Sequence, residues 1–357
     1  MKLEAARLYI RAPNWVGDLV MATPILRAIR EAYPASHITV GVRPGHDAVL
    51  RGDRSFDSLH FHPRKLGFGG LRRLAAELAR ERFDAAFLLP NSFETALAAA
   101  LAKIPRRFGY AASGRSLLLT DRLAPAMAGF RRIPTPMPNY WAELLRLAGI
   151  EARDLRPRLF VDDETAASVD RWLSERGIAP GDRFAVVAPG ASFGASKLWR
   201  ADRFAEVIDD LARREGLKSL VQFGPGEEAI ANDIVRRSQT GALLADAPPL
   251  DLHRLKAAIR RCALLVCTDS GVRHYGVAFE KPVVCVMGPN DPRYTAANLE
   301  RTIVVREDVE CGPCQLKVCP LDHRCMERIP AERVVGAALE LLRSPRAGPT
   351  ATSESAA

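Results

Sequence analysis

The sequence has no long apolar run and no leader-like start. Its longest candidate for a membrane-spanning segment, residues 83–102, is interrupted by Pro90, Asn91 and Glu94, whereas a transmembrane helix needs about 20 consecutive, largely apolar residues. No basic segment followed by a short apolar stretch stands near the first residue, so nothing indicates secretion. We therefore expect a cytoplasmic protein without a transmembrane helix.

The glycine fingerprint of a dinucleotide-binding fold is also missing. A short apolar strand at residues 8–11 is followed by the loop 12–18, which contains one glycine, Gly17, instead of Gly-x-Gly-x-x-Gly. A nicotinamide-dependent dehydrogenase is therefore disfavoured.

Excess positive charge is missing from the second half of the chain. Residues 1–155 hold 23 Lys and Arg against 14 Asp and Glu, a net charge of +9, and residues 156–357 hold 28 of each kind. A basic first half suits an acidic partner, either phosphorylated lipid on an anionic membrane face or nucleic acid. No nucleic-acid motif or aromatic–basic interleaving accompanies the charge, so we expect no nucleic acid partner. A basic face that is merely solvated stays open as an alternative.

The chain reads as two α/β units. With 357 residues it is long for one core, and apolar strands alternate with amphipathic helices in both halves. Proline and charge around residues 153–158, with a helical pattern at 164–176, indicate a boundary. We predict a first domain over residues 1–155, a hinge and linker helix over 156–180, a second domain over 181–345 and a disordered tail over 346–357.

The most informative turn follows the apolar strand at residues 262–267. It reads Asp269-Ser270-Gly271, and His274 stands one turn into the next helix. At the carboxyl end of a buried parallel strand, Gly271 lets the backbone approach a ligand, and the helix start favours an anion such as a diphosphate. The alternative is that Asp269 or Ser270 only caps the helix.

Two further glycine-containing loops follow predicted strands in the second half, at residues 189–197 and 224–228. Together with the Asp269 turn they predict one composite nucleotide-binding edge. Lys197 is a candidate charge partner for a diphosphate there, and a solvated surface lysine is the alternative. In the first half, Asp18 stands where the first loop meets its helix, as either an N-cap or a general base facing the other domain.

Four of the seven cysteines form a compact cluster, Cys311-x2-Cys314-x4-Cys319-x5-Cys325. In a cytoplasmic chain this spacing favours a small structural zinc site over disulfides, and His323 could replace one ligand. Nothing in the cluster points to catalysis.

The motifs occur in an order that resembles a known family. They are Asn14-Trp15-Val16-Gly17-Asp18, Leu89-Pro90-Asn91-Ser92-Phe93, Ile104-Pro105-Arg106-Arg107, Pro189-Gly190-Ala191 with Lys197, and Thr268-Asp269-Ser270-Gly271 with His274. The set, from Leu8 to Leu342, resembles glycosyltransferase family 9, the ADP-heptose:lipopolysaccharide heptosyltransferases, and within that family the heptosyltransferase II group. Each motif alone is weak, and the ordered set is specific.

The resemblance implies a GT-B architecture, in which two Rossmann-like domains face each other across a cleft. The N-terminal domain would bind a phosphorylated, lipid-linked oligosaccharide at an anionic membrane face, and the C-terminal domain would bind the ADP-sugar. Such enzymes invert the anomeric centre and require no cofactor for catalysis. By analogy Asp18 would deprotonate the acceptor hydroxyl, and Lys197 would offset charge on the departing ADP.

The resemblance also assigns binding residues. The donor side comprises Ser192, Lys197, Glu227, Asp269, Ser270, Gly271 and His274. The acceptor side comprises Asn14, Trp15, Asn91 and Ser92. The sequence departs from the family at Arg273, where an apolar residue is common, and the cysteine cluster is absent from well-known relatives.

Two other functions remain open at this level. One is a transferase of the same fold that uses another nucleotide sugar or another cell-surface glycan. The other is a non-catalytic nucleotide-sugar-binding scaffold, which is disfavoured because a scaffold has no need for Asp18, Lys197, Asp269 and His274 together.

Overall fold

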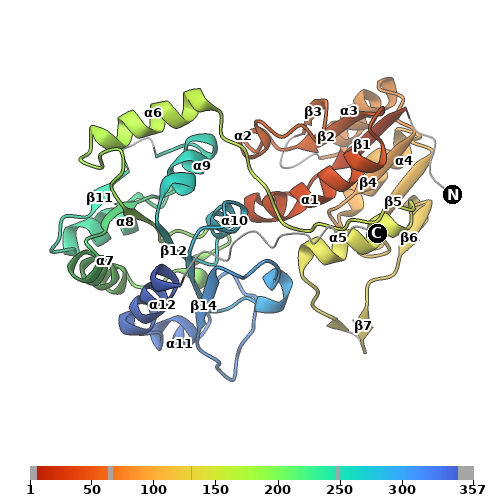
Figure 1. Cartoon of the computed structure of the whole chain (residues 1–357). Helices are drawn as coiled ribbons and strands as arrows, with labels where there is room; N and C mark the ends of the chain where they lie inside the picture. Colours follow the sequence, from red (N-terminus) through yellow and green to blue (C-terminus); the bar gives the residue numbers. More distant parts are fainter. Residues whose placement is uncertain (1–5, 63–66, 130, 246–248, 345–357) are drawn as a thin grey trace, which may run out of the picture.

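The computed structural model describes residues 6–62, 67–129, 131–245 and 249–344. The tail predicted for residues 346–357 lies outside these described residues. The chain forms two α/β lobes, each built on a six-stranded sheet (Figure 1). The predicted architecture of two Rossmann-like domains is therefore confirmed.

The first lobe has the sheet order β3-β2-β1-β4-β5-β6, with every neighbouring pair parallel. The strands are β1 (Arg7–Arg11), β2 (His37–Val42), β3 (Ser58–Phe61), β4 (Ala85–Leu88), β5 (Arg106–Tyr110) and β6 (Asp121–Leu123). The helices are α1 (Val16–Ala32), α2 (Asp47–Leu50), α3 (Gly67–Arg80), α4 (Phe93–Leu101), the 3-10 turn η1 (Ser116–Leu118) and α5 (Met137–Arg146). A small antiparallel hairpin joins β7 (Met127–Ala128) to β8 (Arg131–Arg132).

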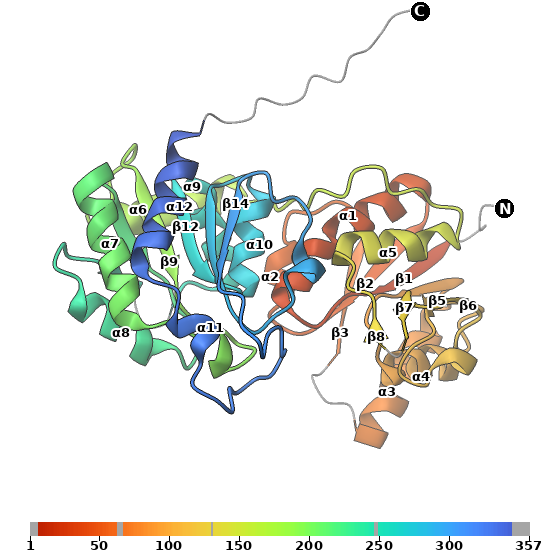
Figure 2. The same ribbon diagram turned by 90° about the horizontal axis from the view of Figure 1, so that it is seen from below.

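Helices cover both faces of this sheet, because alternate residues of a strand point to opposite sides. In β1, Leu8 and Ile10 belong to the large core shared with α1 and α5, and Tyr9 belongs to a smaller core with α3 and α4. Figure 2 shows α1 and α5 on one side of the strands and α3 and α4 on the other.

The second lobe repeats the same topology with the order β11-β10-β9-β12-β13-β14, again entirely parallel. The strands are β9 (Phe184–Ala188), β10 (Lys218–Val221), β11 (Leu243–Leu244), β12 (Leu264–Thr268), β13 (Val283–Met287) and β14 (Thr302–Arg306). The helices are α6 (Asp163–Ser174), η2 (Ala195–Lys197), α7 (Ala201–Glu215), α8 (Glu228–Arg237), α9 (Leu252–Arg261), α10 (Gly271–Ala278), η3 (Pro292–Thr295), α11 (Arg324–Glu327) and α12 (Ala331–Arg343). In Figure 1, α7, α8 and α12 lie together, and α6 and α9 lie on the opposite side of the sheet.

In the described part of the chain, contacts of α1 with α10 and of α2 with α9 join the lobes. At the second contact the fully buried Lys256 of α9 donates to the carbonyls of Val49, at 3.1 Å, and Arg51, at 3.0 Å, at the end of α2. These carbonyls lack partners within their own helix, so the ammonium satisfies them across the interface.

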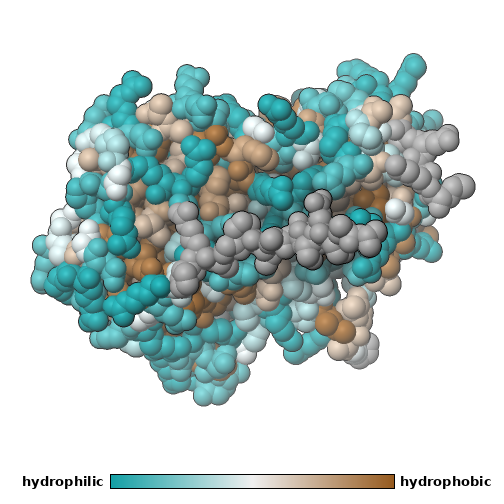
Figure 3. Space-filling view, in the orientation of Figure 1, coloured by the Kyte–Doolittle hydropathy of each residue, from teal (hydrophilic) through white to brown (hydrophobic). Residues whose placement is uncertain are grey.

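The helices and the surface bear on whether the chain has a long apolar segment. No helix in the described part of the chain is long and apolar enough to cross a membrane. The face in Figure 3 is mostly hydrophilic, and its hydrophobic residues gather in separate small patches.

Candidate active site

The sheet order brings most of the predicted site residues to two corresponding places. In each lobe the strand order reverses between the first and fourth strands, and ligands of open α/β sheets bind outside the carboxyl ends of the strands at this point. In the first lobe Asn14 follows β1 and Ser92 follows β4. In the second lobe Lys197 follows β9 and Asp269 follows β12.

The two switch points meet because α1 and α10 touch near their first turns. A Cβ atom added to Gly17 would lie 2.8 Å from Cδ2 of His274 and 3.2 Å from Cα of Gly271. A Cβ atom added to Gly271 would lie 3.0 Å from the backbone nitrogen of Gly17. Only glycine fits at both positions, so the positive ends of two helix dipoles converge on one place.

Asp269 is the centre of the charged groups on the second lobe. Lys197 donates from Nζ to the main-chain oxygen and to Oδ2 of Asp269, both at 2.7 Å. Asn290 donates to the same Oδ2 at 2.8 Å, and Nη1 of Arg273 lies 3.5 Å from Oδ1. Burial alone would raise the pKa of Asp269, but the charges of Lys197 and Arg273 outweigh it and lower the pKa. Asp269 is therefore an ionised, buried carboxylate.

The contacts of Lys197 and Asp269 decide two questions that the sequence left open: whether Lys197 is a solvated surface lysine, and whether Asp269 or Ser270 only caps α10. Lys197 is only 8% exposed, so the solvated surface lysine is wrong. Ser270 occupies the N-cap position of α10 without a side-chain capping bond, and Asp269 bonds to Lys197 instead. The cap-only interpretation of this turn is therefore also wrong. The Ser270 hydroxyl is buried without a hydrogen-bond partner among the described residues.

Asp18 projects from the first turn of α1, and the N-cap residue is Trp15, so Asp18 is not the cap. Burial raises the pKa of Asp18 from 3.8 to about 6, the charge of Lys197 lowers it, and Asp269 raises it further. Lys197 and Asp269 act on Asp18 although they belong to the other lobe. The pKa is low enough for Asp18 to be mainly ionised at neutral pH and high enough for a useful base.

His274 is buried against Gly17. Burial, followed by the charge of Arg273, lowers the pKa of its imidazole from 6.5 to about 3. His274 is therefore neutral at physiological pH and can offer a ligand one N–H donor, without a positive charge.

The loop with Lys197 rests on the cysteine-containing segment. Ser196 donates its backbone N–H to Lys317 O at 3.1 Å and its hydroxyl to Leu316 O at 2.5 Å, and its carbonyl lies 2.6 Å from Nε2 of His323. No sequence pattern indicates this contact, because it joins residues more than a hundred positions apart. His323, predicted as a spare metal ligand, instead contacts the neighbour of Lys197.

The cysteines themselves lie near one another. Burial raises the pKa of the Cys325 thiol, and the nearby thiols of Cys314, Cys319 and Cys311 raise it further. All four are free thiols. Within the described ranges, no group of three or more His, Cys, Asp or Glu side chains is arranged to hold a metal ion.

Glu227 and Ser192, the remaining residues predicted on the donor side, differ in their surroundings. The carboxylate of Glu227 accepts the backbone N–H of Gly224 at 2.7 Å and occupies the space that a Cβ of Gly190 would need. Glu227 thus links the loops after β9 and β10. Ser192 is exposed in the loop before η2.

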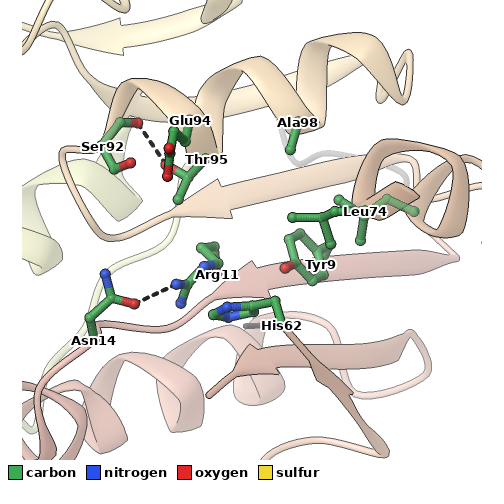
Figure 4. A pocket seen from close by; sticks show the side chains of 10 residues that line it. Tyr9, Arg11, Asn14, His62, Leu74, Ser92, Glu94, Thr95 and Ala98 are labelled. Carbon is green, nitrogen blue, oxygen red and sulfur yellow. Dashed lines mark hydrogen bonds between the residues drawn. The ribbon is translucent and has the colours of Figure 1, made fainter. Parts of the chain in front are cut away.

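On the acceptor side, the first lobe holds a small pocket at the carboxyl end of β1. It is lined by Tyr9, Arg11, Asn14, His62, Leu74, Leu78, Ser92, Glu94, Thr95 and Ala98. Figure 4 shows polar side chains of the loop after β1 and of the start of α4 at one end, with Tyr9, Leu74 and Ala98 at the other. The pocket thus includes the predicted Asn14 and Ser92.

Arg11 is the pocket residue that sequence reasoning missed. It is 6% exposed and donates to Oδ1 of Asn14 at 2.5 Å and to the carbonyl of Gly41 at 3.3 Å. In the described part of the chain no carboxylate forms an ion pair with it, and burial lowers its pKa to about 10. The available signal was an arginine directly after the apolar residues Leu8, Tyr9 and Ile10, at the end of β1.

Trp15 and Asn91, the other two residues predicted on the acceptor side, do not line this pocket. Trp15 is 43% exposed. Asn91 uses its side chain within the lobe, donating to the Tyr140 hydroxyl at 2.9 Å and accepting from Arg115 at 3.0 Å. Asn91 therefore acts in this structure as a support for the loop after β4.

Comparison with known proteins gives a consistent result. Residues 71–324 match the family model of glycosyltransferase family 9 (heptosyltransferase). Lipopolysaccharide heptosyltransferase 2 of Salmonella typhimurium is 29% identical over 313 residues, covering 84% of this chain and 88% of that protein.

Two solved structures share the fold across nearly the whole chain. A family 9 glycosyltransferase from Veillonella parvula superposes with a TM-score of 0.82 at 23% identity, covering 96% of this chain and 98% of the other. The ADP-heptose lipopolysaccharide heptosyltransferase II of Escherichia coli superposes with a TM-score of 0.74 at 23% identity, covering 94% and 98%.

Proposed function

The chain belongs to glycosyltransferase family 9 and is therefore a transferase, and from this premise we propose that it moves a heptose from ADP-heptose to a lipopolysaccharide core acceptor. The curated relatives that it matches over most of their length are heptosyltransferases named for lipopolysaccharide or lipooligosaccharide. The observation that carries the proposal is the close approach of Gly17, the neighbour of Asp18, to Gly271 and His274 of the other lobe. It brings Asp18 near enough for Lys197 and Asp269 to change its pKa.

The reaction is a single displacement at the anomeric carbon. Asp18 accepts the proton of the acceptor hydroxyl while the oxygen of that hydroxyl attacks the anomeric carbon. The bond from the anomeric carbon to the diphosphate oxygen breaks. ADP departs with the electron pair, and the configuration inverts because nucleophile and leaving group lie on opposite sides. A base and a cation on facing lobes match this geometry.

Positive charge for the departing diphosphate comes from the protein. Lys197 supplies an ammonium, and the first turn of α10 offers the backbone N–H of Gly271. The N–H of the N-cap residue Ser270 already donates to the Thr268 carbonyl at 2.8 Å. This charge lets the reaction proceed without a cofactor in our proposal. The unpartnered Ser270 hydroxyl and the neutral His274 N–H serve as further donor contacts, and Glu227 and Ser192 lie on adjoining loops.

The first lobe is proposed to bind the acceptor. Its pocket holds Asn14 and Ser92, and the buried cation Arg11 suits an anionic group on a phosphorylated, lipid-linked saccharide. The net charge of +9 in residues 1–155 favours peripheral contact with an anionic membrane face on the cytoplasmic side. Exposed Phe68 on α3, beside the Arg72 guanidinium, is compatible with that contact.

The cysteine cluster is proposed to be structural rather than catalytic, with zinc as the metal that it would take. After burial, the neighbouring thiols of Cys314, Cys319 and Cys311 raise the pKa of the Cys325 thiol, but no three side chains of the described residues are placed to hold a metal ion, so the thiols would have to move together to bind one. A metal bound there would stabilise the segment that holds Ser196 and thereby the position of Lys197.

Calorimetric binding of ADP, UDP, GDP and CMP to the purified protein tests the donor. We expect selective binding of ADP, lost in Asp269→Ala, followed by mass-spectrometric detection of heptose transfer to a heptose-deficient lipopolysaccharide acceptor. Preference for another nucleotide would replace the donor sugar and retain the reaction. No binding to any of them would refute the proposed donor site, whereas ADP binding without transfer would favour the non-catalytic scaffold.

A further inference from the structure

Arg273 is a buried cation that the reaction described above does not use. It lies on α10 and is 1% exposed. Its Nη1 donates to Oγ1 of Thr295 at 3.0 Å and lies 3.5 Å from Oδ1 of Asp269, and its Nη2 donates to the Thr295 carbonyl at 3.4 Å. Burying a guanidinium is unfavourable unless an opposite charge and hydrogen bonds compensate it.

A second cation beside Asp269 becomes important because of the position of Lys197. Both hydrogen bonds of the Lys197 ammonium go to Asp269. The ammonium has a third N–H donor, which can bond to a departing diphosphate, but its single positive charge is then divided between the diphosphate and Asp269. Unless another cation replaces the charge that Lys197 gives up to the diphosphate, Asp269 is a buried carboxylate that the Asn290 amide and a shared lysine charge compensate only in part. Leaving a buried charge uncompensated is strongly unfavourable.

Arg273 is placed to provide that replacement. It faces Oδ1 of Asp269, whereas Lys197 and Asn290 bond to Oδ2. The present distance of 3.5 Å leaves room for a shorter contact. The Nε of Arg273 has no hydrogen-bond partner among the described residues, so no further bond fixes the guanidinium at its present distance.

We propose that Arg273 is a positioning residue that keeps Asp269 in place and compensates its charge, so that Lys197 is free to turn to the diphosphate of the donor. The inference rests on the proposed function, because it presupposes a diphosphate leaving group. Arg273 itself touches no reacting atom and acts through Asp269. In relatives with an apolar residue at this position, Lys197 and Asp269 would have to share the charge differently.

The position of Arg273 has a second consequence that fits the same role. Its charge helps to keep His274 neutral. The positive charge near the donor is thus concentrated on the Lys197 ammonium and the Arg273 guanidinium, which contact opposite oxygens of Asp269.

Steady-state kinetics of Arg273→Met, Arg273→Lys and Thr295→Val test the proposal. For Arg273→Met we expect kcat to fall about 10- to 100-fold, the loss expected for a hydrogen bond between charged groups, with weaker ADP binding. Arg273→Lys should recover part of both. Thr295→Val removes only the hydroxyl contact of the guanidinium, so its kinetics should stay within about twofold of wild type.

A double-mutant cycle separates positioning from simple support of the fold. If Arg273 acts through Asp269, Arg273→Met should have little further effect in an Asp269→Asn background. Equal losses in both backgrounds, or a Thr295→Val loss as large as that of Arg273→Met, would overturn the proposal. So would unchanged turnover of a folded Arg273→Met protein.

Folding and the underlying function have their own controls. Melting temperatures are measured for each variant, and if Arg273→Met is unfolded at the assay temperature, Arg273→Lys carries the test. It should then lose turnover several-fold, and an unchanged kcat would refute the role of Arg273. A wild-type protein that neither binds ADP nor transfers sugar would instead refute the proposed function.

Discussion

Replacing Asp18 with asparagine should make the protein more stable while it loses activity. The pKa of Asp18 is raised from 3.8 to about 6 in the folded protein. The folded state therefore binds this proton more tightly than the unfolded chain does. The stability contributed by the group is present below the unfolded-state pKa and is lost as pH rises through the folded-state pKa.

The magnitude follows from the shift. A rise of about two pKa units corresponds to about 3 kcal/mol of unfavourable free energy for the ionised group at neutral pH. An asparagine side chain carries no charge at any pH, so Asp18→Asn should remove this penalty near pH 7 and change little near pH 4. Asp269→Asn is the matched control, because Lys197 and Arg273 lower the pKa of Asp269, and loss of its charge should destabilise the protein.

Thermal unfolding at pH 4 and pH 7, combined with a transfer assay, provides the measurement. We expect Asp18→Asn to melt several degrees above wild type at pH 7, with the difference disappearing at pH 4. Transfer should fall by about 10²- to 10⁴-fold, the usual contribution of a general base, with ADP affinity retained. A variant that melts below wild type at pH 7 and loses ADP binding as well would show that Asp18 has a structural role.

The other predictions concern single contacts. Lys197→Ala should weaken ADP-sugar binding, slow turnover, or both, and unchanged kinetics would remove Lys197 from the site. Gly17→Ala should lower transfer because its Cβ would lie 2.8 Å from the His274 ring, whereas Gly336→Ala, with open space around it, should not. Arg11→Met should raise the acceptor KM several-fold at constant ADP affinity, and a change in ADP affinity would contradict its place on the acceptor side. Protein purified under reducing conditions should contain about one zinc or iron per chain, and substantially less would refute a metal site in the cysteine cluster at residues 311–325.

Much of the site could be predicted because local rules place residues at the ends of parallel strands. Parallel strands present their carboxyl ends along one edge of a sheet. The turn Asp269-Ser270-Gly271, which stands between an apolar strand and a helix, was therefore expected at that edge. The same rule located Lys197 and Asn14. The sequence could not decide between capping and other roles for Asp18, because both place a carboxylate at the start of a helix.

Contacts between distant segments could not be predicted. The approach of Gly17 to His274, the burial of Lys197 and the support of Ser196 by the segment around Leu316 all depend on how the two lobes and their loops meet. In the sequence, Arg11 follows three apolar residues and Arg273 stands where the resemblance leads us to expect an apolar residue. Their pocket and counter-ion became apparent only in three dimensions.

In the proposed mechanism, the charges around Asp18 couple this general base to the binding of the donor. In the structure Lys197 lowers the pKa of Asp18 and Asp269 raises it, after the larger effect of burial. When a diphosphate binds, it adds negative charge and engages Lys197, so both changes raise the proton affinity of Asp18. Asp18 therefore becomes a stronger base when a leaving group is present. Because the acceptor hydroxyl is a weak acid, this coupling makes proton removal most favourable when the sugar donor is in place to react.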